Sequence, residues 1–214
     1  MKRILVMVSI VAMIGSSCTK STDVVGPIIP PRENEYPVFG LAFKQDGTGD
    51  LRSNFNLTPT NTDYPTEYGI EFSPAKKGVL YAIGFRMPQA GKYYVSLWDA
   101  DTKNLLLRDS TDYTDPAKFL YVDFSQKKQE LALSRNKKYM ASVYAPRSPL
   151  GSPRPYYTLL QPGIPGWVPF TQGNIIVSGS FYKKEDYPTY PEIQILHPDV
   201  LNGLVDIGFY KTEF

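Results

Sequence analysis

The fold is decided by a stretch that reads SLWDADTKNLLL over residues 96–107. Apolar residues at both ends of this stretch flank a polar turn from Asp99 to Asn104. Asp and Asn side chains hydrogen-bond to their own backbone and tolerate the left-handed conformations that tight turns require. The stretch therefore predicts a β-hairpin whose first strand ends at Trp98 and whose second strand begins at Leu105.

Short runs rich in β-branched and aromatic residues recur along the chain between clusters of Gly, Pro, Asn and Asp. Such runs predict strands, and no window longer than about ten residues shows a capped helical stripe. The expected strands are Val38–Phe43, Tyr68–Phe72, Val79–Arg86, Tyr93–Trp98, Leu105–Arg108, Phe119–Phe124, Leu131–Leu133, Tyr139–Tyr144, Ile175–Ser180 and Leu204–Tyr210. Many short strands separated by turns favour an all-β fold, an antiparallel, jelly-roll-like β-sandwich, as one domain over residues 36–214.

The first 17 residues predict a secretory signal peptide. Lys2 and Arg3 precede an apolar run over residues 4–14, and small residues lead up to Cys18. The run is about half the ~20 residues that a membrane-spanning helix needs. The segment resembles the signal of bacterial lipoproteins, in which the Cys after the cleavage site receives diacylglycerol and an N-acyl chain. We therefore expect Cys18 to be lipidated, with an ordinary signal peptide and a free thiol as the alternative.

Residues 18–35 predict a tether between the lipid and the folded domain. The stretch contains Pro27, Pro30 and Pro31 and no aromatic residue, and proline-stiffened linkers reach roughly 3 Å per residue. Thr19, rather than Asp, follows the Cys, which by resemblance to Gram-negative sorting rules favours the outer membrane. The periplasmic and cell-surface faces of that membrane both stay open.

The composition disfavours several classes of function. Removal of residues 1–17 takes away two basic residues and no acidic one, which leaves 21 of each and a formal charge of zero. A chain without an excess of basic residues has no field that attracts nucleic acid. One Cys cannot form an internal disulfide, and one His cannot supply a two-His zinc site. We expect no cofactor.

Four segments together carry a resemblance to a known family. They read YGIEFSPAKKGVLYAIGFR, SLWDADTKNLL, KKYMASVYAP and NGLVDIGF. They are similar to segments of the bacterial domain-of-unknown-function family 4082, and the matching positions are Gly69, Phe72, Gly84, Arg86, Leu97, Trp98, Tyr144, Ala145, Pro146, Val205 and Asp206. The resemblance implies a jelly-roll-like sandwich that often accompanies extracellular carbohydrate-active modules, and it implies no particular chemistry.

Arg86 and Asp206 each lie in an otherwise apolar strand sequence. Charged groups are rarely buried unless they are paired. We therefore expect the two side chains to meet across the sheet as a bidentate structural ion pair. The alternative is that both point outward from a strand with one buried face.

Candidate catalytic and metal-binding groups are sparse. His197 lies in a turn-like Leu-His-Pro-Asp sequence, and no Gly-x-Ser-x-Gly elbow occurs. The possible carboxylate pairs also fall in turn-like sequence, where Asp usually serves the backbone or solvent. Asp46 and Asp50, in Asp-Gly-Thr-Gly-Asp, are weak candidates for a structural calcium ion, with a plain hairpin turn as the preferred explanation. The sequence therefore predicts no catalytic residue.

The most informative connection spans residues 145–170 and contains seven prolines. Connections longer than about 12–15 residues are usually functional or disordered, and the aromatic content of this one opposes disorder. Rigid aromatic rings suit stacking on sugars, and Arg side chains hydrogen-bond hydroxyls or carboxylates. Arg154, Tyr156, Tyr157 and Trp167 are therefore candidate ligand-binding residues. The alternative is a lid that folds back onto the core.

These features together predict a non-catalytic, lipid-anchored envelope protein whose β-sandwich binds a glycan. The alternative is a structural or adhesion protein that docks another envelope protein through the same aromatic surface or an exposed sheet edge. A hydrolase is the least favoured class, because glycoside hydrolysis needs two carboxyl groups that face each other in a cleft.

Overall fold

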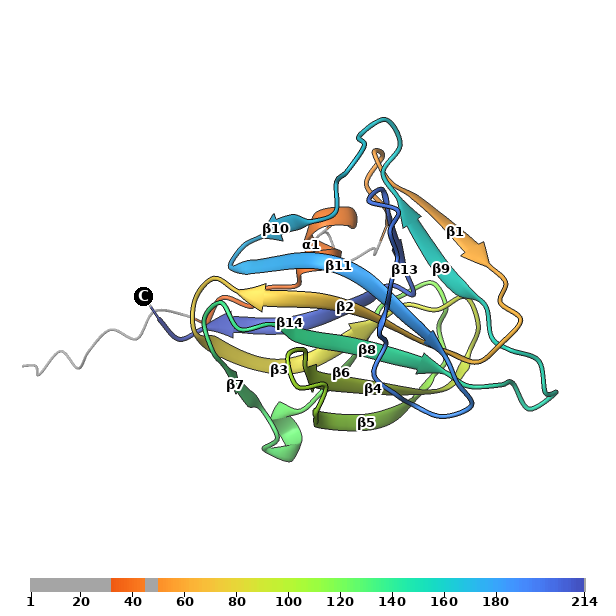
Figure 1. Ribbon diagram of the computed structural model, residues 1–214, viewed down its shortest axis with the longest axis horizontal. Coiled ribbons are helices and arrows are strands. Elements are labelled where there is room, and N and C mark those ends of the chain that lie inside the picture. Colours follow the sequence, from red (N-terminus) through yellow and green to blue (C-terminus); the bar gives the residue numbers. More distant parts are fainter. Residues whose placement is uncertain (1–31, 45–49, 214) are drawn as a thin grey trace, which may run out of the picture. The chain divides into compact units, whose positions relative to one another are not determined.

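Antiparallel strands make up nearly all the regular structure of residues 32–44 and 50–213, the part of the chain that the computed structural model describes (Figure 1). The strands are β1 (Asn56–Thr60), β2 (Thr66–Pro74), β3 (Gly78–Phe85), β4 (Gly91–Asp99), β5 (Leu105–Tyr113), β6 (Leu120–Asp123), β7 (Leu131–Leu133), β8 (Tyr139–Ala145), β9 (Tyr156–Leu160), β10 (Phe170–Gln172), β11 (Ile175–Lys184), β12 (Ile193–Gln194), β13 (Val200–Asn202) and β14 (Val205–Lys211). The other elements are helix α1 (Pro37–Ala42) and the 3-10 turn η1 (Ser125–Lys127). The expected all-β antiparallel sandwich is confirmed.

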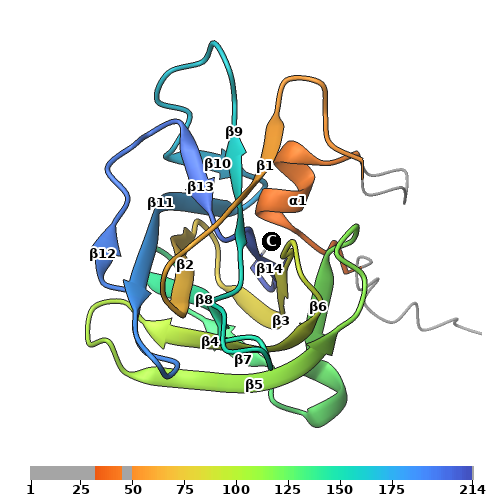
Figure 2. The ribbon, with the colours of Figure 1, turned by 90° about the vertical axis from the view of Figure 1, so that its right-hand side faces the viewer.

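The strands form three sheets. The largest runs in the order β10–β11–β2–β8–β4–β5, and β12 pairs with the far end of β11. The second runs β14–β3–β6 with β7 beside the start of β3, and the third runs β1–β9–β13. Strand β14 packs across β2 and β8, so the two larger sheets form the layers of the sandwich (Figure 2).

The hydrophobic core lies between these two layers. Phe72 of β2 and Leu97 of β4 are fully buried in the largest sheet, as are Ile83 of β3 and Phe209 of β14 in the second. Successive side chains of a strand point to opposite faces of its sheet. The residues of β4 that alternate with Leu97 therefore face the outer side of the largest sheet, where they form part of a polar cluster described below.

The hairpin expected at residues 96–107 is present as β4 and β5. The Asp99 carboxylate accepts hydrogen bonds from the backbone N–H groups of Asp101 and Thr102, each at 3.0 Å. Lys103 has a φ of +58°, in the left-handed region. A hydrogen bond from the Lys137 ammonium to the Asp99 carboxylate, with Nζ and Oδ2 2.6 Å apart, lowers the pKa of Asp99 to about 2. The turn chemistry that the sequence predicted is thus formed by Asp99.

The prediction of a strand over residues 38–43 is wrong, because residues 37–42 form helix α1. Pro37 lies in the first helical turn, where its fixed φ suits a helix and its missing N–H is not needed. The Asp206 carboxylate accepts hydrogen bonds from Val38 N (2.9 Å) and Phe39 N (3.0 Å), donors that the start of a helix leaves free. This cap comes from the far end of the chain, so a local sequence pattern does not reveal it.

Five short strands lie where the sequence predicted connections, namely β1, β9, β10, β12 and β13. Strand β9 runs through the proline-rich connection 145–170 and pairs with β1 on one side and β13 on the other. Pro155 and Pro162 flank β9, and Pro59 lies in β1, which is an edge strand where a missing N–H is tolerated. The connection is therefore partly a strand rather than one long loop.

The last residues of the expected tether contact the domain. Glu35 N donates to Phe209 O (2.7 Å), and the Glu35 carboxylate accepts two hydrogen bonds from Asn174. The compact unit therefore begins at Arg32, slightly before the expected boundary. Cys18 and the signal segment lie outside the described residues. Within the described residues no helix has the length and apolarity needed to cross a membrane.

Candidate functional site

A groove of about 890 Å³ opens where the largest sheet meets the three-stranded sheet. Its lining comes from β2, β9, β11 and β13 and from the segments 61–63 and 194–197. Three tyrosines line it, Tyr68, Tyr156 and Tyr182, and we call it the tyrosine groove. The site is assembled from segments far apart in the sequence.

The three tyrosines are held in place by strand pairing. Tyr68 of β2 lies opposite Tyr182 of β11 in the register, so the two side chains share one face of the sheet. The centroid of the Tyr156 ring lies 4.6 Å from that of Tyr68, and the rings are tilted by 32°. Gly203 permits this packing, because its φ is +71° and a Cβ there would lie 2.2 Å from Cβ of Tyr68. Tyr68 is 3% exposed and forms the base of the groove, so the half-buried Tyr156 and Tyr182 rings present its accessible aromatic faces.

Polar side chains surround the aromatic faces. The Lys184 ammonium lies 2.7 Å from the Asp63 carboxylate, and this hydrogen bond lowers the pKa of Asp63 and raises that of Lys184. The Thr158 hydroxyl donates to Oδ1 of Asn202 at 3.0 Å, which orients the Asn202 amide beside the tyrosines. The exposed His197 ring also lines the groove. This arrangement suits a molecule that combines apolar ring faces with hydroxyl groups.

Tyr156 is the one of the four predicted ligand-binding residues that lines the groove. Trp167 is 7% exposed and packs edge-on against Phe55, with the ring centroids 5.5 Å apart. Its indole N–H donates to the backbone carbonyl of Asp199. The position of Trp167 therefore favours the alternative of a lid folded onto the core.

Arg154 and Tyr157 also serve packing. Arg154 is 5% exposed, its Nη1 donates to Ala90 O (3.2 Å), and its guanidinium lies 5.0 Å from the centroid of the Tyr93 ring. Tyr157 is half-buried against the core, on the face of β9 opposite Tyr156. The proline-rich connection therefore contributes one of its four candidate side chains to the groove.

Asp206 is fully buried, as expected for a structural charge, but Arg86 is not its partner. Besides the two amides of α1, the Asp206 carboxylate accepts a hydrogen bond from the Tyr121 hydroxyl at 2.7 Å. Burial raises the pKa of Asp206 to about 6 in spite of these donors. Arg86 Nε instead donates to Pro116 O (3.2 Å). The predicted pair is replaced because Asp206 caps a helix that the sequence indicated as a strand.

The weak calcium candidate is described only in part. Asp46 lies outside the described residues, and the Asp50 carboxylate lies 3.7 Å from the Lys44 ammonium. Residues 32–44 and 50–213 contain no group of three or more His, Cys, Asp and Glu side chains placed to hold a metal ion. The calcium prediction therefore still rests on the sequence alone.

A buried polar cluster lies on the outer face of the largest sheet. The carboxyl of Glu67 on β2 is fully buried, and its Oε1 lies 2.5 Å from the Ser142 hydroxyl, which in turn accepts the indole N–H of Trp98 at 2.8 Å. The backbone N–H of Thr189 donates to the other Glu67 oxygen at 3.3 Å. Burial raises the pKa of Glu67 to about 8, so this carboxyl is protonated at neutral pH.

The buried Glu67 carboxyl predicts a pH dependence of stability. Its folded pKa of about 8 lies above the usual 4.5, so the stability it contributes is fully present below pH 4.5 and is lost as the pH rises towards 8. Glu67→Gln keeps the shape and hydrogen bonds of the neutral carboxyl. The stability of this variant relative to wild type should therefore rise between pH 5 and 8, by up to about 1.4 kcal/mol per pH unit, and then level off.

Urea unfolding at pH 5, 7 and 9 checks this prediction. Glu130→Gln removes an exposed carboxylate and is the control, for which we expect no comparable trend with pH. A Glu67→Gln effect of the same size at all three pH values would contradict the buried, protonated carboxyl.

No protein-family model matches the chain, and a search of the curated proteins finds no match. The likeness to family 4082 therefore remains a prediction from its short segments. Function is inferred from the geometry of the tyrosine groove.

Proposed function

We propose that the protein is a non-catalytic, lipid-anchored envelope protein whose β-sandwich binds a glycan in the tyrosine groove. The observation that carries this proposal is the pair of half-buried tyrosines, Tyr156 and Tyr182, held over the buried Tyr68 ring in one groove beside amide and charged groups. Aromatic faces pack against the C–H faces of a sugar ring, while polar groups satisfy its hydroxyls. A volume of about 890 Å³ lies within the usual range of ligand pockets.

The charges of the groove favour binding over hydrolysis. Glycoside hydrolysis generally uses two carboxyl groups about 5–10 Å apart on either side of the scissile bond. Asp63 is the single acidic residue among the described residues that line the groove, and its carboxylate is bound by Lys184. A second carboxyl group to complete a catalytic pair is not among these lining residues.

The proposed anchor agrees with a role outside the membrane. The compact unit begins at Arg32, 14 residues after Cys18. A proline-containing tether of that length reaches roughly 40 Å at about 3 Å per residue. That reach is enough to hold the groove clear of the lipid headgroups if Cys18 carries the lipid in the outer membrane.

Tyr156→Ala should weaken glycan binding at least tenfold. The substitution removes the half-buried ring that forms one side of the groove, and a tenfold loss corresponds to about 1.4 kcal/mol. The measurement is a screen of the chain from Thr19 onward, which contains the whole compact unit, against a broad panel of glycans. Any glycan that binds is then titrated into wild type and the variant.

Two further variants sharpen this test. Tyr156→Phe keeps the ring and should retain most of the affinity. Tyr210→Ala removes a half-buried strand tyrosine of the second sheet that, like Tyr156, packs against one tyrosine ring, and it should bind as wild type does. Glycan binding that is equally strong in Tyr156→Ala would place the site elsewhere on the sandwich.

Docking of another envelope protein is the second candidate function, and one observation favours it. Leu196, on the rim of the tyrosine groove, is 86% exposed, and Ile193 nearby is also exposed. Exposed apolar side chains beside a groove are typical of protein-binding sites. Under this alternative Leu196→Ser abolishes capture of the partner from the native envelope, whereas a glycan stacked on the tyrosines is bound with unchanged affinity.

A further inference from the structure

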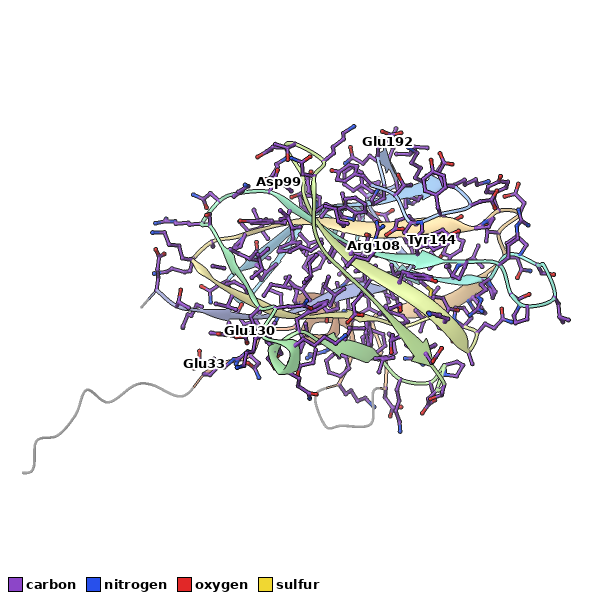
Figure 3. The ribbon with its side chains drawn as sticks, turned by 90° about the horizontal axis from the view of Figure 1, so that it is seen from below. Glu33, Asp99, Arg108, Glu130, Tyr144 and Glu192 are labelled. Carbon is purple, nitrogen blue, oxygen red and sulfur yellow. The ribbon has the colours of Figure 1, made fainter. Side chains whose placement is uncertain are left out.

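A second hollow, of about 570 Å³, lies on the outer face of the largest sheet. Tyr94 of β4, Arg108 of β5 and Tyr144 of β8 form its floor. Arg147, Asp186, Tyr187 and three prolines complete the lining, and we call this hollow the arginine pocket. Tyr144 is paired with Glu67 in the register, so the pocket lies on the face of β2 opposite Tyr68. Figure 3 shows Arg108 and Tyr144 close together on this side of the sheet.

The guanidinium of Arg108 is fixed on the pocket floor by neutral groups. Its Nε donates to the Ser96 hydroxyl (3.0 Å), and its Nη2 donates to the carbonyl of Pro188 (3.3 Å). The guanidinium carbon lies 5.1 Å from the centroid of the Trp98 ring. A half-buried guanidinium held in this way is oriented before any ligand arrives, which reduces the entropic cost of binding.

The charge of Arg108 is not neutralised within the described residues. No ion pair joins Arg108 to a carboxylate of residues 32–44 or 50–213, and burial raises the pKa of the nearby Glu67 carboxyl to about 8, which favours its neutral form at pH 7. Arg147, the second guanidinium of the pocket, lies 3.4 Å from Asp186, which also accepts a hydrogen bond from the Tyr64 hydroxyl. Two guanidinium groups therefore face one carboxylate, which leaves the pocket with a net positive charge.

The aromatic side chains of the pocket are suited to packing on one face of a ring. The Tyr94 and Tyr144 rings lie 6.2 Å apart, centroid to centroid, and Tyr187 is 61% exposed at the rim. A bare inorganic anion needs no such aromatic surface. A ring that carries a carboxylate uses both features, because guanidinium groups bind carboxylates through paired N–H donors and tyrosines pack on sugar C–H faces.

We propose that the arginine pocket binds the carboxylate of an acidic sugar, a hexuronic acid, with Arg108 and Arg147 as its donors and the Tyr94 and Tyr144 rings as the apolar part of its floor. The inference rests on the proposed function and names the class of glycan. The two hollows are neighbours, because Asp63 and Lys184 line the groove, while Pro65 and Asp186, each two residues further along the chain, line the pocket.

The test titrates three small probes into the protein: sodium glucuronate, glucose and sodium acetate. Binding is measured from the chemical shifts of the backbone amides. Glucuronate should shift the amides around Tyr94, Arg108 and Tyr144 and should bind at least tenfold more tightly than either glucose, which lacks the charge, or acetate, which lacks the ring. Equal binding of glucose and glucuronate, or of acetate and glucuronate, would overturn the proposal.

Variants separate this pocket from the tyrosine groove. Arg108→Gln should weaken glucuronate binding at least tenfold, and Arg147→Gln, at an exposed side chain whose loss does not threaten the fold, should weaken it several-fold. Arg135→Gln, which removes an exposed charge at the opposite end of β8, is the matched control and should change nothing. Glucuronate binding that survives both pocket substitutions contradicts the inference.

Different results would contradict glycan binding in the tyrosine groove and acidic-sugar binding in the arginine pocket. If neutral glycans bind in a Tyr156-dependent way while glucuronate does not bind, the acidic-sugar inference fails and the proposed function stands. If glucuronate shifts the pocket amides and no glycan depends on Tyr156, the pocket stands and the groove is not the site.

Discussion

Trp167→Ala is expected to lower the free energy of unfolding by about 3–5 kcal/mol, the usual loss for a buried tryptophan. The ring fills the space between Phe55 and Phe170, with centroid distances of 5.5 Å and 5.6 Å, and its N–H is satisfied by the Asp199 carbonyl. For a chain of this size, about 2–4 °C of Tm accompanies each kcal/mol, so Tm should fall by roughly 6–20 °C.

Thermal unfolding checks this expectation, with Leu150→Ala as the control. Leu150 belongs to the same proline-rich connection but is 93% exposed, so its removal should change stability by less than about 0.5 kcal/mol. An unchanged Tm in Trp167→Ala, together with lost glycan binding, would show that Trp167 acts at the surface as a ligand-binding residue.

Asp206→Ala should have the second largest effect, a loss of about 3 kcal/mol or more. Its carboxylate accepts hydrogen bonds from two backbone N–H groups of α1 and from the Tyr121 hydroxyl, all in or near the core. Each buried donor left without an acceptor costs about 1–3 kcal/mol. We therefore expect Tm at pH 7 to fall by roughly 6–12 °C, and α1 to detach from the sandwich first.

Two further variants separate the loss of the hydrogen-bond acceptor from the mere removal of a negative charge. Asp206→Asn keeps one acceptor oxygen and should lose less stability than Asp206→Ala. Asp112→Ala removes an exposed carboxylate of β5 and should leave Tm nearly unchanged. A Tm of Asp206→Ala equal to that of wild type would mean that Asp206 does not anchor α1.

Local chemistry made much of the fold predictable. Asp99 and its neighbours determine the β4–β5 turn through bonds within three residues, so the hairpin at 96–107 could be inferred from that stretch alone. The long strands of the two larger sheets likewise carry their own period-two patterns. Nine of the ten expected strands therefore fall on strands of the structure.

The other elements depend on contacts between distant parts of the chain. Helix α1 is capped by Asp206, and its apolar residues Val38 and Phe39 would suit a strand equally well. Strand β9 lies between two prolines and is defined by its partners β1 and β13 rather than by its own composition. A pattern of a few residues carries no information about such pairings. The predicted ion pair between Arg86 and Asp206 was wrong for that reason.

The candidate site was predictable to a smaller degree. Tyr156 was predictable because a rigid aromatic residue in a long, proline-rich connection is typical of a binding loop. Tyr68 and Tyr182 were missed as ligand-binding residues, since a tyrosine in a strand is read as part of the sheet, and the expected strand 175–180 ended before Tyr182. A sequence signal for both exists: each tyrosine lies two residues from a polar residue, Thr66 or Lys184, at a strand end where side chains leave the core.

The central claim is that the tyrosine groove binds glycans, and amide chemical-shift mapping with a glycan selected from the panel tests it most directly. We predict that the largest shifts occur at residues 61–68, 182–184, 194–197 and 202, and that Tyr156→Ala abolishes them at the same glycan concentration. Shifts confined to residues 161–170 around Trp167, or the absence of saturable binding to any glycan of the panel, would contradict the account.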